Sequence, residues 1–204
     1  MDKINYDYLM MKEIETFNGE KKSILLHSCC GPCSSSVIER LREYFNITVI
    51  YYNPNIEPDT EYEKRKQVQI GLLNELGIPY LDAPYANEEF HRLTKGLEEE
   101  PEGGARCHVC YGFRLKYTAN IAKENNFDYF TTTLTVSPYK NSEVINKIGE
   151  SIGNEIGIKY LYSDFKKKDG YKRSIELSKQ YSLYRQDYCG CLYAKSVEGD
   201  KDEK

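Results

Sequence analysis

Residues 22–41 read KSILLHSCCGPCSSSVIERL, and this stretch decides the fold. Its first six residues, 22–27, are apolar enough for a buried strand, while residues 34–45 repeat apolar side chains at helical spacing. Three cysteines lie in the loop between them. A buried strand that leads through a short loop into a helix is the first unit of an α/β fold built from βαβ units.

The rest of the chain continues this alternation. Further strands are predicted at residues 47–53, 79–82, 129–134 and 159–162, and further helices at residues 59–76, 87–97, 107–125, 141–153 and 174–184. Such alternation predicts a three-layer Rossmann-like fold, in which a mostly parallel sheet is covered by helices on both faces. Ligands of these folds bind beyond the carboxyl ends of the strands, so we expect a metal site there.

The length of 204 residues suits one domain. We expect an N-terminal leader over residues 1–21, a single domain over residues 22–195 and a flexible charged tail over residues 196–204. The N-terminus lacks the apolar core of a signal peptide, and no apolar run approaches the length of a membrane span. The sequence therefore predicts a cytoplasmic protein with no membrane partner.

Seven cysteines fall into three tight groups that are far apart in the sequence. They are Cys29, Cys30 and Cys33; Cys107 and Cys110; and Cys189 and Cys191. In a reducing compartment an odd number of cysteines does not indicate structural disulfides. Three clusters of this kind predict one site that is assembled by folding.

The first group lies where a strand meets a helix N-terminus, which lowers thiol pKa values. Residues 30–33, CGPC, match the redox motif of thioredoxins, so a thioredoxin-like thiol oxidoreductase is one alternative. Against it, the chain contains no Trp and carries five further cysteines. In adenine-nucleotide hydrolases of similar, HUP-type architecture, Ser and Gly hold phosphate in this loop. Here cysteines replace them, which argues against nucleotide hydrolysis.

The other two groups favour metal binding. The CxxC spacing of Cys107 and Cys110 suits zinc or an iron–sulfur cluster, and a zinc-stabilised RNA-binding module is the second alternative. The CxC pair, Cys189 and Cys191, suits metal ligation or a strained, easily reduced disulfide.

Charge is distributed unevenly along the chain. The net charge is −4, yet residues 159–185 carry eight basic residues against three acidic ones. A basic segment on an acidic protein favours a local nucleic-acid contact.

Five motifs occur in an order that resembles the QueH family of cobalamin-independent epoxyqueuosine reductases, over about residues 24–192. The motifs read HSCCGPCS, YYNPNIEP followed by EYEKR, RCHVCYGFRL, TTLTVSPYKN and DFKKKDGYKRSIELSKQYSLYRQDYCGC. The resemblance implies the last step of queuosine synthesis, in which an epoxide on the wobble base of tRNA is reduced to an alkene. That reaction takes two electrons and two protons and releases water. The sequence does not identify the electron donor.

The resemblance also implies site residues. A [4Fe–4S] cluster would be held by Cys29, Cys30, Cys107 and Cys110. Cys189 and Cys191 would be redox-active, or would bind a second, mononuclear iron together with Cys33, a position that other members can fill with Asp.

Further candidates come from the residues themselves. Asp164 and Asp187 are candidate acids or ligands, and His91 and His108 are candidate proton donors. Phosphate contacts are expected from Lys140, Lys166, Lys167, Lys168, Lys172 and Arg173. Stacking of an RNA base is expected from Tyr139, Tyr171 or Tyr184.

Overall fold

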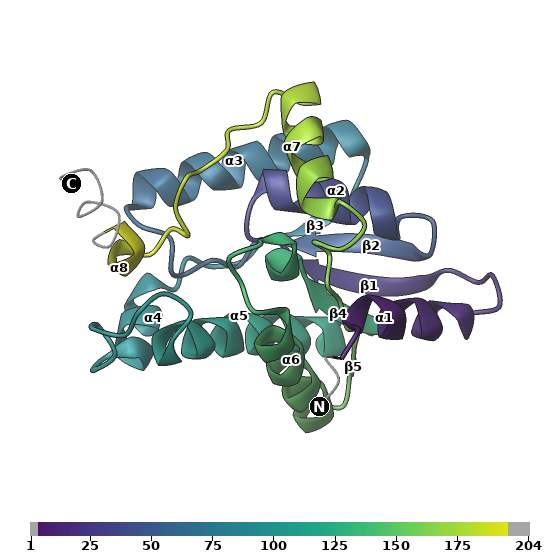
Figure 1. The fold of residues 1–204 in the computed structure, drawn as a ribbon, viewed down its shortest axis with the longest axis horizontal. Coiled ribbons are helices and arrows are strands. Elements are labelled where there is room, and N and C mark those ends of the chain that lie inside the picture. The colour runs from purple at the N-terminus through teal and green to yellow at the C-terminus, as the bar shows by residue number, and fades with distance from the viewer. Residues whose placement is uncertain (1–3, 196–204) are drawn as a thin grey trace.

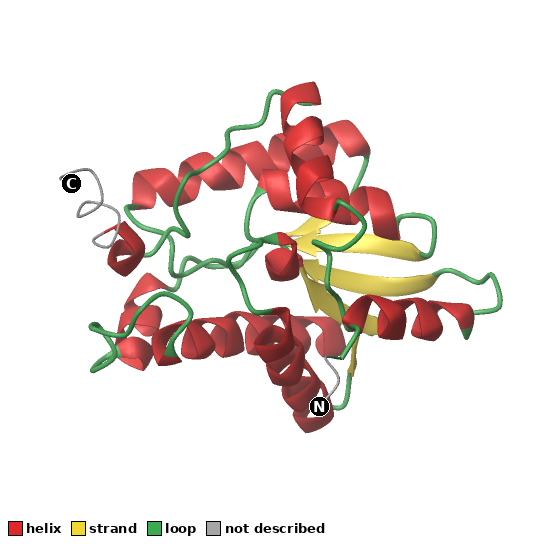
Figure 2. Cartoon of the chain, viewed as in Figure 1, coloured by secondary structure: helices red, strands yellow, loops and turns green. Residues whose placement is uncertain are grey.

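The computed structural model describes residues 4–195, so the tail predicted over residues 196–204 lies outside the described residues. Within residues 4–195, five parallel strands form one sheet in the order β3-β2-β1-β4-β5 (Figure 2). The strands are β1 (Lys22–His27), β2 (Phe45–Ile50), β3 (Tyr80–Leu81), β4 (Tyr129–Thr132) and β5 (Lys159–Tyr160). The strand order reverses between β1 and β4, which places a topological switch point beyond their carboxyl ends.

Helices cover both faces of this sheet. They are α1 (Tyr6–Glu15), α2 (Gly31–Leu41), α3 (Asp59–Leu76), α4 (Asn87–Thr94), α5 (Ala105–Glu124), α6 (Ser142–Ile156), α7 (Gly170–Gln180), α8 (Leu192–Lys195) and the 3₁₀ helix η1 (Thr133–Val136). Figure 1 shows α2, α3 and α7 on one side of the strands and α5 and α6 on the other. The predicted three-layer α/β fold is therefore confirmed.

Two cores hold the layers together, because successive side chains of β1 point to opposite faces. Ile24 and Leu26 pack into a first cluster with Met10 of α1 and Val37 of α2. Leu25 packs into a second cluster with apolar residues of α5 and α6. Within residues 4–195, no helix is long and apolar enough to cross a membrane.

The structure differs from the sequence predictions where helices begin and end. Helix α2 starts at Gly31 rather than at residue 34, because Cys30 has extended backbone angles (φ −172°, ψ 161°) and Pro32 fits the first helical turn. Cys33 therefore lies within the helix rather than in the loop. Helix α7 spans Gly170–Gln180 rather than residues 174–184, since Ser182 adopts a left-handed backbone (φ 50°) just beyond its end.

Candidate metal and redox site

The site begins where β1 ends, at the switch point of the sheet. The Cys29 N–H donates to Thr133 Oγ1 at 3.1 Å, and the Thr133 hydroxyl donates to Cys29 Sγ at 3.3 Å. Thr133 follows β4, so one threonine joins the two strands that flank the switch point. The backbone of Ser28 is fixed as well, because its carbonyl accepts from Asn53 Nδ2 at 2.8 Å.

Three sulfurs gather at this point. Those of Cys29, Cys30 and Cys33 all lie within 4.8 Å of one another, close enough for one metal centre. Hydrogen bonds from the Cys30 and Cys33 thiols hold the pKa of Cys29 well below its usual range. Hydrogen bonds to Cys29 and Cys30, together with burial, raise the pKa of Cys33. The hydrogen bond to Cys29 raises the pKa of Cys30 to about 12. Cys29 is therefore the thiol of the group that loses its proton most readily.

The second pair lies on the first turns of α5. Cys107 and Cys110 are each 8% exposed, and the Gly103 N–H donates to Cys107 Sγ at 3.2 Å. Burial raises the pKa of Cys110 to about 11, although the nearby Arg114 opposes this. Cys107 belongs to the same core cluster that Cys29 packs against. The first and second cysteine groups thus border the same apolar core.

The third pair reaches the site through a constrained turn. Cys189 Sγ accepts from Lys140 Nζ at 3.3 Å, and Cys191 packs beside Cys110. Burial raises the pKa of Cys191 to about 12. Between them Gly190 adopts φ +116°, and a Cβ there would lie 2.8 Å from Ile56. Only glycine suits this turn, which passes directly over the loop after β2.

The first and third groups share one pocket, and the second group contacts its lining through Arg114. A pocket of about 390 Å³ is lined by Cys29, Cys33 and Cys189. All seven cysteines are free thiols in the structure, so the CxC pair is not joined as a disulfide here. In the described part of the chain, Cys29, Cys30 and Cys33 lie close enough together to bind one metal ion. Cys107 and Cys110 are not part of that group.

Buried cations face these sulfurs. Arg114 is 2% exposed, and it contacts Cys110 Sγ at 3.9 Å, His27 Nε2 at 3.3 Å and the side-chain oxygen of Asn53. Burial, and next the charge of Arg114, lower the pKa of His27 to about 3, so this histidine is neutral. Within residues 4–195, no carboxylate pairs with Arg114. The positive charge of Arg114 can therefore interact with the cysteine sulfurs.

Lys140 is the second buried cation, with a side chain that is 10% exposed. Burial lowers its pKa, but the charges of Cys189, Tyr111 and Cys29 outweigh burial and leave the pKa raised. The nearest acidic oxygen, from Glu102, is 3.9 Å away. Two buried positive charges inside a thiol-rich pocket create a site for an anionic group. A thiolate-bound iron–sulfur cluster has that character, so the residues present fit such a group.

The other predicted residues divide between this pocket and its surroundings. Asp187, Tyr139, Tyr171 and Lys140 line the pocket. Asp164 lies outside it and pairs with Lys166 at 2.9 Å. His91 and His108 do not line the pocket, and His91 pairs with Glu57 at 2.9 Å.

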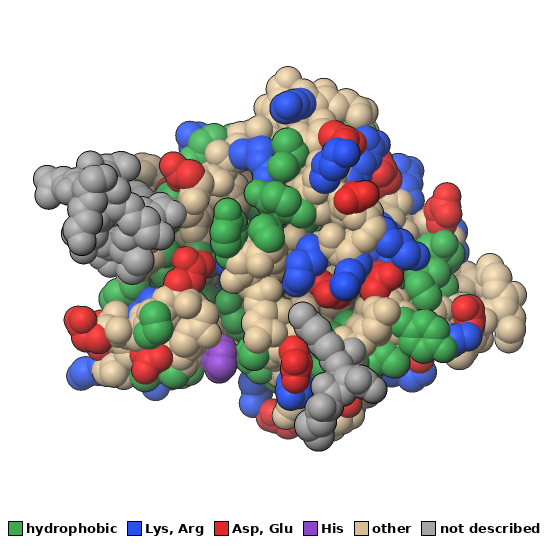
Figure 3. All heavy atoms as spheres, viewed as in Figure 1, with side chains coloured by type: hydrophobic (Ala, Val, Ile, Leu, Met, Phe, Trp, Pro, Cys, Tyr) green, Lys and Arg blue, Asp and Glu red, His purple; other side chains and the backbone are tan. Residues whose placement is uncertain are grey.

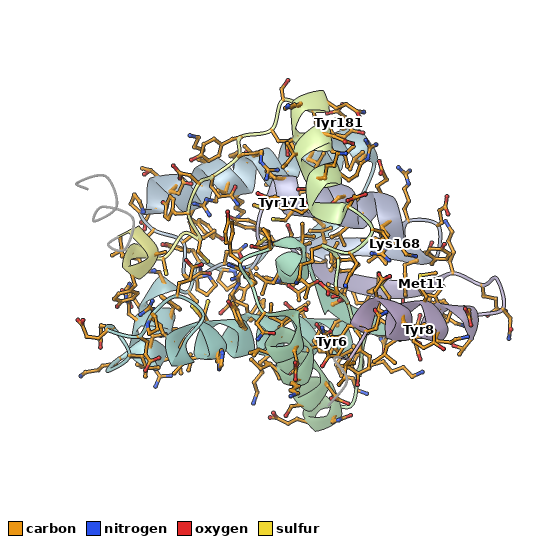
Figure 4. All side chains as sticks on the ribbon, viewed as in Figure 1. Tyr6, Tyr8, Met11, Lys168, Tyr171 and Tyr181 are labelled. Atoms are coloured by element: carbon orange, nitrogen blue, oxygen red, sulfur yellow. The ribbon has the colours of Figure 1, made fainter. Side chains whose placement is uncertain are left out.

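Most of the predicted phosphate-binding residues are engaged with acids. Arg173 contacts Glu39 at 2.8 Å and Glu176 at 3.0 Å, and Lys168 lies 3.9 Å from Asp7. Figure 4 shows Lys168 beside α1 and Tyr171 at the start of α7. The sequence interpretation missed Arg114 and Thr133. The spacing of Arg114, four residues after Cys110, is a signal that places it on the same helix face.

Fold and site together define a class: Rossmann-like proteins with a cysteine-rich, cation-lined site at the switch point of a parallel sheet. The profile of one family, described as Epoxyqueuosine reductase QueH, matches residues 24–197. This chain belongs to the QueH family.

Relatives support this assignment over nearly the whole chain. The Epoxyqueuosine reductase QueH of Streptococcus pyogenes serotype M1 is 45% identical, over 97% of this chain and 80% of its own length. The protein of that name from Staphylococcus epidermidis is 44% identical, over 97% of this chain and 87% of its own length.

Solved structures share the fold at low identity. The U34-tRNA thiolase NcsA from Methanococcus maripaludis, solved with its [4Fe-4S] cluster, has a TM-score of 0.55 and 15% identity, over 96% of this chain and 73% of that protein. A predicted subunit of tRNA methyltransferase from Methanocaldococcus jannaschii has a TM-score of 0.52 and 12% identity, over 89% of both chains. These likenesses establish the common fold.

Proposed function

We propose that this protein is an epoxyqueuosine reductase, which removes the epoxide oxygen of epoxyqueuosine in tRNA to form queuosine. The observation that carries this proposal is a pocket lined by Cys29, Cys33 and Cys189 together with two buried cations, Arg114 and Lys140, of which Arg114 also contacts Cys110 of the second group. Deoxygenation of an epoxide needs electrons and protons delivered to one place. A pocket built from redox-capable side chains at the switch point suits that need.

We propose an iron–sulfur site whose ligands are divided between the cysteine groups. Cys29, Cys30, Cys107 and Cys110 would hold a [4Fe–4S] cluster, while Cys33, Cys189 and Cys191 would hold a second iron or act as a dithiol. Bound there, an iron–sulfur centre supplies electrons one at a time. The low pKa of Cys29 favours its role as a ligand, because metals bind the thiolate form.

The remaining residues of the pocket handle charge and protons. Arg114 and Lys140 supply positive charge beside the sulfurs. Asp187 lines the pocket and is our candidate proton donor, whereas Asp164 is held by Lys166 outside the pocket and would act only by positioning the loop after β5. The two electrons come from a separate donor, and the protein would work in the cytoplasm with its tRNA substrate.

The test is a reduction assay. Protein purified and reconstituted anaerobically with iron and sulfide, together with a chemical reductant, should convert epoxyqueuosine in tRNA to a nucleoside lighter by one oxygen atom. Mass spectrometry of the digested tRNA measures this. The same sample should be brown and should contain both iron and acid-labile sulfide.

Two variants separate the proposed roles. Cys107→Ala should lose iron, sulfide and turnover together. The double variant Cys189→Ser with Cys191→Ser should keep the brown centre and lose turnover. A colourless protein that contains only zinc, or wild-type protein that reduces disulfides but not epoxyqueuosine, would instead favour an RNA-binding module or a thiol oxidoreductase.

A further inference from the structure

One aromatic ring at the pocket is unusually exposed. Tyr139 is 82% exposed, the largest value among the exposed large hydrophobic side chains of residues 4–195. It lies in the loop between η1 and α6, and it lines the same pocket as Cys29, Cys33 and Cys189. Its backbone N–H donates to Ser137 Oγ at 3.3 Å. This bond lies within the loop, and the ring itself projects into water.

The other tyrosines considered for stacking are already occupied. The ring of Tyr171 lies 5.8 Å from the Arg185 guanidinium, and the residue packs against the first core cluster (Figure 4). The ring of Tyr184 is covered by Lys64 Nζ at 3.4 Å, and its hydroxyl donates to Glu61. Within the described residues, the Tyr139 ring makes no aromatic or cation–π contact, and its hydroxyl makes no hydrogen bond. The face of the Tyr139 ring is therefore free to stack against a base.

A free ring at the mouth of a reactive pocket matches a need of the proposed substrate. A base that enters the pocket must leave the stack of its own strand, and the neighbouring base then loses a stacking partner. Aromatic side chains replace such partners on unpaired nucleic acid without regard to sequence. The pocket that the ring borders carries positive charge, because Arg65, Arg114, Lys140 and Arg185 also line it.

We propose that Tyr139 is a stacking platform for the unpaired base next to the nucleotide that enters the pocket. The protein would therefore bind the anticodon loop as an opened single strand. This inference rests on the proposed function, since it takes a nucleotide of tRNA as the occupant of the pocket.

The chain contains no Trp, which allows a direct test. In protein purified anaerobically, Tyr139→Trp introduces a single indole. An unmodified anticodon stem-loop RNA should quench its fluorescence, and a blunt RNA duplex should not. Tyr8→Trp is the matched control, because Tyr8 is 56% exposed on α1 and does not line the cysteine pocket. Its fluorescence should not respond to either RNA.

Affinity gives a second readout. Tyr139→Ala should weaken binding of the stem-loop roughly ten-fold, and Tyr139→Phe should bind like wild type, because stacking needs the ring and not the hydroxyl. Equal quenching by loop and duplex, or wild-type affinity of Tyr139→Ala, would overturn the inference. Neither measurement requires turnover, so a wild-type protein that fails the reduction assay counts against the proposed function separately.

Discussion

Arg114 is the residue whose placement needs the most explanation. A guanidinium buried without a carboxylate is costly, because its charge loses hydration and gains only neutral partners. Here His27 is neutral, Asn53 is uncharged, and the remaining contact is Cys110 Sγ at 3.9 Å. The arrangement becomes favourable when the cysteines carry negative charge. Arg114 therefore indicates that the folded site is built around thiolates or an anionic group that they bind.

The reduction potential of the bound centre tests this role. Replacing Arg114 by Gln removes a positive charge next to the ligands, so adding an electron becomes less favourable. The midpoint potential of the reconstituted protein should fall by an amount on the order of tens of millivolts. A redox titration followed by electron paramagnetic resonance measures it.

Lys116→Gln is the control for this change. Lys116 also lies on α5 but is exposed and pairs with Glu155 at 2.6 Å. Its removal should leave the potential unchanged. Identical potentials for Arg114→Gln and wild type would show that Arg114 serves packing alone.

At the scale of elements, the sequence predicts the order of strands and helices because periodicity is local information. It could not fix the start of α2, since the extended backbone of Cys30 depends on its surroundings in the fold. Thr133 was predicted within a strand, and nothing local reveals that its hydroxyl meets Cys29 from 104 residues away. The clustering of the cysteines in the sequence predicts a single site, but the buried cations beside the sulfurs, Arg114 and Lys140, needed coordinates.

Helix α6 packs closely against the sheet at its glycines, of which Gly149 makes the tightest approach. A Cβ on Gly149 of α6 would lie 2.4 Å from the ring of Tyr160 on β5, so this helix sits directly on the sheet edge. Gly149→Ala should therefore destabilise the protein by about 1–2 kcal/mol, because overpacking outweighs the better helix propensity of alanine. Chemical denaturation measures the free energy of unfolding.

Gly71 on α3 provides the opposite case. A Cβ there meets nothing within 4 Å, so Gly71→Ala should stabilise the protein by up to about 1 kcal/mol. Equal effects of the two substitutions would mean that α6 can move away from β5 at little cost.

At the scale of the whole molecule, the proposed tRNA substrate is an acidic polymer, so an acidic protein needs a local basic surface to bind it. The net charge is −4, and Figure 3 shows basic and acidic side chains interspersed over the face that carries α7. Ion pairs between surface side chains explain this mixture, because Arg173 pairs with Glu39 and Glu176. A cation that already pairs with carboxylates attracts a phosphate less strongly, because the carboxylates offset its charge.

The salt dependence of RNA binding distinguishes the paired cations from the unpaired ones. Within residues 4–195, no ion pair involves Lys167 or Lys172, and both are exposed. Removing one cation that binds a phosphate should reduce the slope of log affinity against log salt by roughly 0.7–0.9. The double variant Lys167→Gln with Lys172→Gln should therefore bind the anticodon stem-loop with a slope lower by roughly one to two units. Arg173→Gln should leave the slope near the wild-type value, because the Arg173 guanidinium pairs with Glu39 rather than with a phosphate. If Arg173→Gln lowers the slope as much as the double variant does, RNA displaces these carboxylates, and the ion pairs do not decide which cations meet the substrate.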